Sequence, residues 1–230
     1  MQFQTHEAEE SLTPERMTRL KKALEAKQPD LTVLLDGVRT GRNLSAIVRT
    51  CDAVGVLRVH GIPAEGRRPR LRREASSGSR KWVQVRWHPD REAALRHLRE
   101  RGFRIVAADP GPDAADFREV DYTLPTALVL GAEVEGISAL AAERADARIR
   151  VPMHGMVESL NVSVAAALVL YEAERQRRAA GMYAEPRLPP ERVARLLFEW
   201  GHPRLAERLR ERGLPFPAVR DDGSLDFGRG

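Results

Sequence analysis

Short apolar runs alternate along the chain with segments of helical spacing. The apolar runs have the length and the β-branched content of buried strands, and they lie at residues 31–38, 56–62, 83–88, 103–109, 125–133 and 147–153. Segments with apolar residues at helical spacing lie at 44–55, 89–102, 136–145 and 158–178, and residues 39–43 are expected to be a loop. The alternation predicts an α/β fold with a mostly parallel sheet and helices on both faces.

The two ends of the chain carry basic helices of a different pattern. Residues 1–30 are expected to form an N-terminal helical extension, in which Thr13 and Pro14 suit the N-cap and the first helical position. Residues 181–230 are expected to form a C-terminal extension with two short basic helices and a tail rich in Pro, Gly and Asp. Residues 31–180 between them are expected to form one core domain.

The helical segment 158–178 begins with three polar side chains, those of Ser159, Asn161 and Ser163. Ser159 fits the N-cap because a seryl oxygen accepts an amide hydrogen of the first turn, but one cap explains only one of the three. Asn161 stands out since the chain has one other asparagine, Asn43, and both lie where an apolar segment begins. The apolar residues between 162 and 170 leave no polar face, so we expect this helix to bury one side on its own sheet and the other on a partner.

Composition indicates a globular protein with an affinity for phosphate. The 230 residues are 42% hydrophobic and 31% charged, with a formal net charge of +5 and four lysines among 38 basic residues. Arginine suits phosphate, so nucleic acid is a natural partner, although a codon or heat-adaptation bias explains the preference for arginine equally well. Such a bias does not explain the basic cluster between Arg67 and Lys81, which favours phosphate contact over a merely solvated loop.

Several classes of protein are excluded by missing motifs. The lone Cys51 leaves no disulfide framework and no multi-cysteine metal site, and the six histidines are scattered without ligand spacing, so no metal is expected. The turn at 131–136 lacks the lysine and hydroxyl of a phosphate-binding P-loop, and no strand is followed by a dinucleotide-type glycine triplet. No apolar signal core or membrane span is present, so we expect no membrane contact and a cytoplasmic protein.

Three segments that follow predicted strands remain as candidate sites: 43–50, 131–136 and 151–173. They resemble the three sequence motifs of the SpoU branch of the SPOUT methyltransferases. Residues 27–35, 116–123 and 181–187 further resemble the TrmH group, which methylates the ribose of a D-loop guanosine in tRNA. The resemblance implies a homodimer, tRNA as the partner, and a C-terminal strand and helix threaded into a trefoil knot that holds S-adenosyl-L-methionine.

The resemblance also implies roles for individual residues. Those implied to contact the cofactor are Ala108, Gly131, Val151, Met153 and Leu160. Those implied to serve catalysis are Arg49, Asn43, Glu133, Ser159 and Asn161. Those expected to contact RNA are Lys81, Arg175, Arg177 and Arg178.

Arg49 allows two interpretations. An arginine on an apolar helix face often forms a buried ion pair, here with Asp52 or Glu133. The resemblance implies catalysis instead, and the family's arginine has been cast as a general base. A guanidinium with a pKa above about 12 is a poor proton acceptor, so we prefer an electrostatic clamp on substrate phosphate and on the developing alkoxide, with Glu133 as an alternative proton acceptor.

One departure from the resemblance lies in the turn after Glu133, where relatives often carry a basic residue and this chain has Val134 and Glu135. An RNA contact at that position is expected to be weaker here, or to be supplied by Arg175, Arg177 and Arg178. Two alternative functions remain: ribose methylation of ribosomal RNA, whose enzymes usually carry an added N-terminal RNA-binding domain, and RNA binding without catalysis. The second leaves the combination of Arg49, Glu133 and Asn161 with an apolar cofactor loop unexplained.

Overall fold

The computed structural model describes residues 12–63, 68–69, 78–111, 113–133 and 135–227. The chain divides into two compact units. The larger is Gln28–Met182, and the smaller combines Met1–Lys27 with Tyr183–Gly230. The segments expected to be separate N-terminal and C-terminal extensions thus belong to one unit.

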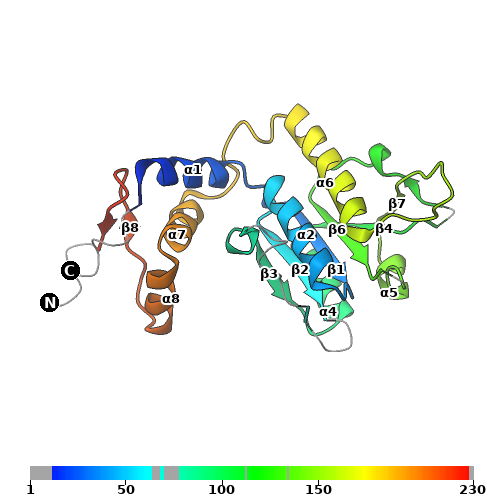
Figure 1. The fold of residues 1–230 in the computed structure, drawn as a ribbon, viewed down its shortest axis with the longest axis horizontal. Coiled ribbons are helices and arrows are strands. Elements are labelled where there is room, and N and C mark those ends of the chain that lie inside the picture. The colour runs from blue at the N-terminus through cyan, green and yellow to red at the C-terminus, as the bar shows by residue number, and fades with distance from the viewer. Residues whose placement is uncertain (1–11, 64–67, 70–77, 112, 134, 228–230) are drawn as a thin grey trace. The chain divides into compact units, whose positions relative to one another are not determined.

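The larger unit is built on a seven-stranded sheet in the order β3-β2-β1-β6-β4-β7-β5, and all its paired strands are parallel (Figure 1). This confirms the predicted α/β class and parallel sheet. The inner strand β1 pairs with β2 on one side and with the central strand β6 on the other. The strands are β1 (Leu31–Asp36), β2 (Arg58–Ile62), β3 (Gln84–Trp87), β4 (Arg104–Ala108), β5 (Ala115–Asp116), β6 (Thr126–Gly131) and β7 (Ala147–Arg150).

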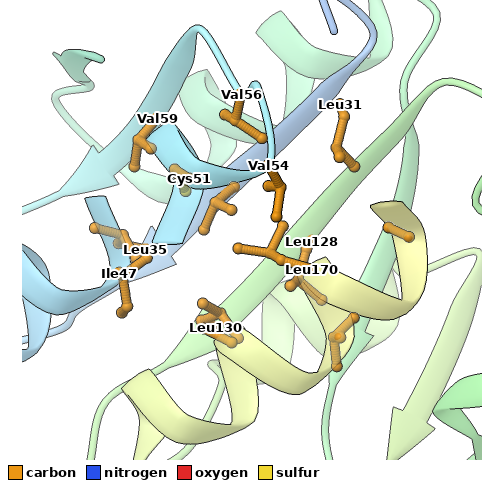
Figure 2. Packing of buried hydrophobic residues seen from close by; sticks show 14 of the residues in the cluster. Leu31, Leu35, Ile47, Cys51, Val54, Val56, Val59, Leu128, Leu130 and Leu170 are labelled. Atoms are coloured by element: carbon orange, nitrogen blue, oxygen red, sulfur yellow. The ribbon is translucent and has the colours of Figure 1, made fainter. Parts of the chain in front are cut away.

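Helices cover both faces of this sheet, as predicted. Buried residues of α2 (Gly41–Ala53) and α6 (Val162–Ala179) share one apolar cluster with Leu31, Val33 and Leu35 of β1 (Figure 2). Buried residues of α4 (Arg91–Arg99) and α5 (Ala139–Glu143) share the other cluster with Leu34. Because successive side chains of a strand point to opposite faces, β1 supplies both clusters and all six of its residues are buried.

Two helices begin elsewhere than predicted. The side chain of Thr40 caps α2 by accepting from the Asn43 amide, so Gly41, Arg42 and Asn43 are helical rather than part of a loop. Helix α6 begins at Val162, and its cap is Asn161 rather than Ser159. Asn and Thr are both good N-cap residues, so the apolar pattern locates the helices but does not select the cap among several candidates.

The smaller unit contains α1 (Pro14–Glu25), α7 (Pro190–Gly201), α8 (Pro203–Glu211) and a short hairpin of β8 (Ala218–Val219) and β9 (Leu225–Asp226). Thr13 caps α1 as predicted, whereas the hairpin was not predicted. Leu12 packs so closely on Gly201 that a Cβ there would overlap it. In the part of the chain that is described, no helix combines the length and apolar character needed to cross a bilayer.

Two short 3-10 helices complete the larger unit, η2 (Ser79–Lys81) before β3 and η3 (Phe117–Glu119) before β6. Phe117 and Tyr122 enter the core cluster under α6, and the Tyr122 hydroxyl donates to the Phe117 carbonyl at 2.8 Å. The segment 116–123 is therefore anchored in the core by Phe117 and Tyr122, while Arg118, Glu119 and Asp121 are exposed.

Candidate active site

Hydrogen bonds join three loops that follow different strands. Asn43 Nδ2 donates to Glu133 Oε1 at 2.7 Å, and Asn161 Nδ2 donates to Asn43 Oδ1 at 3.3 Å. Thr40 Oγ1 also donates to Glu133 Oε1, at 3.0 Å. The network therefore links the start of α2 with the turn after β6 and with the start of α6, which lie 90 and 118 residues further along the chain.

The sheet brings two of these loops together directly. Since β1 and β6 are parallel neighbours, their carboxyl ends meet at one edge, where Asp36 is paired with Gly131. The turn after Gly131 folds back so closely that a Cβ on Gly131 would overlap the backbone of Gly136, which explains the glycine. The buried Asp36 holds the end of this turn by accepting from the Ser138 amide and from Arg91 Nε, each at 2.7 Å.

Asn161 has two hydrogen-bonding roles at the start of α6. Its Oδ1 accepts from the amide and the hydroxyl of Ser163, at 2.8 and 2.6 Å, which caps the helix. Its Nδ2 remains for Asn43. Asn161 thus caps α6 and ties it to the network at the same time, because its amide oxygen and its amide nitrogen serve separate partners.

The pKa of Glu133 lies below its ordinary value. Burial acts to raise this pKa, but hydrogen bonds from Asn43, from its own backbone amide, from Thr40 and from the Arg39 amide together outweigh burial. Glu133 is therefore a carboxylate near neutral pH and a weaker base than an ordinary glutamate. Its geometry suits a residue that holds Asn43 and Thr40 in place better than one that accepts a proton.

A cavity of about 570 Å³ opens beside this network. Its walls come from the end of the loop after β1 and the first turn of α2, namely Arg39, Thr40, Gly41, Arg42 and Asn43. Arg39 and Arg42 are exposed, whereas Asn43 is buried. The cavity therefore combines two exposed cations with one end of the hydrogen-bond network, a combination that the sequence motifs alone did not reveal.

Arg49 and Ser159 stand apart from the network. Arg49 is exposed, two helical turns beyond Arg42 on the same face of α2, so the alternative of a buried ion pair with Asp52 or Glu133 is wrong. Ser159 is exposed in the loop before α6, and its predicted capping role belongs to Asn161. Both side chains are accessible to a ligand, and neither is joined to Asn43 by a hydrogen bond between described residues.

The five residues expected at the cofactor lie at one edge of the sheet. Ala108, Gly131 and Val151 are at or just after the carboxyl ends of the adjacent strands β4, β6 and β7. Met153 and Leu160 lie in the loop from β7 to α6 and are half-buried. Among the described residues, no backbone group of 152–160 hydrogen-bonds to another backbone group. Half-buried apolar side chains beside free backbone donors and acceptors fit an adenosine cofactor.

The four residues expected to contact RNA divide into two groups. Lys81 is exposed in η2, and Arg175 and Arg178 are exposed on α6, where each pairs with a glutamate of its own helix. Arg177 is fully buried, and its guanidinium donates to Asp30 and to backbone carbonyls. The expectation that Arg177 contacts RNA is therefore wrong, because a helix turns neighbouring residues by about 100° and places this one inward.

The wider basic segment around residues 65–81 lies mostly outside the described residues. Arg67, Arg70, Arg72 and Arg73 belong to the part that is not described, and so does Val134 of the departure noted above. Arg68 is exposed. The predicted phosphate contacts of this segment therefore stay predictions.

Three histidines that are scattered in the sequence meet in the structure. His60 Nδ1 and His88 Nε2 are 2.8 Å apart, and the His97 ring lies 5.3 to 5.5 Å from both of theirs. Burial and neighbouring cations lower the pKa of His60 to about 3 and that of His88 to about 4. Within the described ranges no group of His, Cys, Asp and Glu is arranged to hold a metal ion.

Comparison with known families assigns this fold and site to one class. The sequence pattern of the SpoU rRNA Methylase family matches residues 30–171, which include the whole sheet and the hydrogen-bond network. The pattern of the SpoU rRNA methylase C-terminal segment matches residues 175–226. The chain belongs to the SpoU methylase family.

Two individual relatives match this chain over most of its length. A tRNA (guanosine(18)-2′-O)-methyltransferase of Thermus thermophilus is 54% identical over 188 residues, which cover 82% of this chain and 96% of the relative. The Escherichia coli K12 protein of the same name is 46% identical over 217 residues, which cover 94% of each chain.

Solved structures agree with the sequence comparison. The Aquifex aeolicus TrmH/SpoU tRNA modifying enzyme superposes with a TM-score of 0.78 at 45% identity, over 82% of this chain and 96% of that one. The SpoU methyltransferase AviRb from Streptomyces viridochromogenes, in complex with the cofactor AdoMet, superposes with a TM-score of 0.59 at 28% identity, over 67% of this chain and 59% of that one. The catalytic class and the cofactor of the family are thus those of S-adenosylmethionine-dependent methyltransferases.

Proposed function

We propose that this protein transfers a methyl group from S-adenosyl-L-methionine to the ribose 2′-hydroxyl of guanosine 18 in the D-loop of tRNA. The observation that carries the proposal is the network of Asn43, Glu133 and Asn161, which joins one residue from each of the three family motifs. The substrate is taken from the relatives of 46% to 54% identity that bear this activity in their names.

The network supplies position rather than a base. When bound, S-adenosylmethionine would supply an activated methyl on its sulfonium and would leave as neutral S-adenosylhomocysteine. The attacking ribose hydroxyl would release its proton to solvent, so negative charge would develop on its oxygen. Glu133, with its lowered pKa, keeps Asn43 and Thr40 oriented at the edge where the two substrates would meet.

Arg49 is proposed to stabilise the developing charge and to hold a substrate phosphate. Its exposure and its place on the face of α2 that also carries Arg42 leave the guanidinium accessible to RNA. A guanidinium can donate hydrogen bonds to two oxygens at once, and this role does not require it to lose a proton. Ser159, exposed in the loop before α6, is proposed to contact the substrate ribose.

The cofactor is proposed to lie against Ala108, Gly131 and Val151, under the loop that carries Met153 and Leu160. Support comes from the backbone groups of that loop, which make no backbone hydrogen bonds among the described residues, and from the half-buried side chains of Ala108 and Val151 at the ends of β4 and β7. Isothermal calorimetry on the protein without RNA should detect binding of S-adenosylhomocysteine, because the pocket is formed by this chain's own loops. Absence of binding to the folded protein would contradict the assignment.

We further propose that the loop and α6 form the family's trefoil knot. Strand β7 is separated from β1 by β4 and β6, yet the chain after β7 returns so that Asn161 reaches Asn43 in the first turn of α2. The proposal rests on this return together with membership of the SpoU methylase family, since ordinary connections do not thread.

A homodimer is proposed from the exposed face of α6. Val164, Leu168 and Tyr171 are 47%, 40% and 53% exposed and recur at helical spacing, so they form an apolar stripe on the side away from the sheet. Such a stripe on a helix whose other side is in the core indicates a partner surface. A cytoplasmic location is part of the same proposal, since it is where a protein acting on tRNA meets its substrate.

Ribosomal RNA is the alternative substrate, favoured by the description of the family pattern. The test is incorporation of label from S-adenosylmethionine into unmodified tRNA and into ribosomal RNA transcripts under the same conditions. The proposal expects tRNA to be labelled and ribosomal RNA not. Labelling of ribosomal RNA alone would favour the alternative, and binding without labelling of either would leave RNA binding as the function.

A further inference from the structure

Arg39, which lines the cavity beside α2, forms an ion pair with the turn after β6. Arg39 lies just before the cap of α2, and its guanidinium is 2.7 Å from Glu135 Oε1. Glu135 belongs to the turn after β6, at the position where this chain departs from the basic residue of the resemblance. The side chains of both partners are about half exposed, 49% and 53%.

The side chain of Arg39 is not needed for the network behind it. Its backbone amide donates to Glu133 Oε2 at 3.4 Å, and that contact is independent of the guanidinium. The side chain pairs with Glu135 instead. A solvent-exposed pair of this kind is weak, because water and salt screen it and two long side chains must be ordered to form it. A guanidinium in such a weak ion pair can exchange its carboxylate for an anion that binds it more tightly.

A second cation lines the same cavity. Arg42 is exposed in the first turn of α2, and it forms no salt bridge with any residue that the structure describes. Arg49 follows at seven residues, two helical turns along the same face of α2. Arg39 and Arg42 therefore line the cavity, Arg49 lies on the same helix face as Arg42, and Glu135 is the carboxylate that pairs with Arg39.

We propose that this cavity binds a backbone phosphate of the RNA next to the target ribose, with Arg42 as a direct contact and Arg39 exchanging Glu135 for the phosphate. The inference rests on tRNA as the substrate. Arginine forms short, bidentate bonds to phosphate that outcompete a half-exposed carboxylate. Glu135 thus competes with RNA phosphate for Arg39 and weakens the binding of RNA that contacts Arg39 alone. An RNA with a phosphate in the cavity also contacts Arg42, the second cation.

The test is a thermodynamic cycle on binding of an unmodified tRNA transcript, measured by filter retention at several salt concentrations. Glu135→Gln should tighten binding about fivefold at 50 mM salt, the effect expected when one exposed ion pair no longer competes. In the Arg39→Gln background the same change should have no effect, because Glu135 acts through Arg39. Arg42→Gln should weaken binding about tenfold and reduce the salt slope by about one.

Matched controls come from α4, whose buried residues belong to the apolar cluster on the other face of the sheet. Glu92 and Arg96 are exposed there, so Glu92→Gln and Arg96→Gln make the same charge changes away from the cavity. Each should change the dissociation constant less than twofold. Circular dichroism melts of all variants show whether a loss of binding reflects a loss of folding.

Two results would overturn the inference. One is an unchanged affinity in Glu135→Gln, with or without a lowered melting temperature, which would make the ion pair purely structural. The other is equal tightening by Glu135→Gln with and without Arg39, which would make it a general charge effect. Methylation by the unaltered protein is scored separately. If the protein methylates tRNA but the Glu135 and Arg39 variants show no coupling in tRNA binding, only this inference is refuted. If the coupling is present but tRNA is not methylated, only the proposed function is refuted.

Discussion

Arg177 uses all the donor capacity of a buried guanidinium to hold the end of α6 against the start of β1. Its Nη1 lies 2.6 Å from Asp30 Oδ1, and its remaining donors reach Gln28 Oε1 and the carbonyls of Tyr122, Asp30 and Leu124. Replacing this side chain leaves a partly buried carboxylate and several carbonyls without their donor. A loss of this kind is among the costly single changes in a folded protein.

Arg177→Met should therefore lower the free energy of unfolding by about 3 kcal/mol or more, measured by urea denaturation. The control is Arg175→Met, on the same helix and two residues away, whose exposed side chain pairs only with residues of α6. That change should cost less than about 0.5 kcal/mol. Equal costs for the two variants would contradict the buried role of Arg177.

Arg49 is a second single residue with a testable role, and its proposed role is in catalysis rather than in stability. Because its side chain is exposed and a lysine keeps the charge, Arg49→Lys should leave the melting temperature and cofactor binding nearly unchanged. Methyl transfer in a single turnover should fall by about 10², the loss typical when one donor to a developing charge is removed. A stable variant with a near-normal rate would remove Arg49 from the site.

At the scale of elements, α6 has one face in the core and one apolar face exposed. Leu168→Asp should convert the proposed dimer to a monomer in analytical ultracentrifugation, because burying an unpaired carboxylate in an apolar interface is costly. Leu124→Asp is the matched control, since Leu124 is exposed to a similar degree, 43% against 40%, and lies outside α6. An unaltered protein that is already monomeric, or a Leu168 variant that stays dimeric, would contradict the proposed interface.

Local pattern is sufficient to predict most elements of this fold but not how their ends meet. Strand and helix order and the Thr13 cap follow from periodicity and nearest-neighbour chemistry. The contact of Asn43 with Glu133 depends on β6 lying beside β1, and the histidine cluster depends on β2, β3 and α4 being neighbours. Neither contact leaves a signal in the local sequence. The three motifs can therefore be recognised in the sequence, whereas the hydrogen bonds between them depend on the order of strands in the sheet.

At the scale of the whole molecule, the buried histidines make stability depend on pH. His60 and His88, whose pKa values fall from 6.5 to about 3 and about 4, stay neutral in the folded protein where an unfolded chain binds protons. Their contribution is therefore constant above about pH 7 and is lost as the pH falls from about 6.5 towards 4. Each costs up to about 1.4 kcal/mol per pH unit in that window.

Urea denaturation at pH 7.5, 6.5 and 5.5 should show this loss before carboxylates begin to titrate. By NMR, the ring of His60 should stay neutral at pH 5. Protonation of His60 near pH 6, or a free energy of unfolding that does not change between pH 7.5 and 5.5, would contradict the burial of this cluster.

The most direct measurement of the central claim is to map the methyl group that the enzyme adds. Unmodified tRNA is incubated with S-adenosylmethionine, digested to nucleosides and to overlapping fragments, and analysed by mass spectrometry. The account predicts one 2′-O-methylguanosine per tRNA, located at guanosine 18 of the D-loop. A methyl on a base, on a ribose elsewhere in the tRNA, or on ribosomal RNA instead would contradict it.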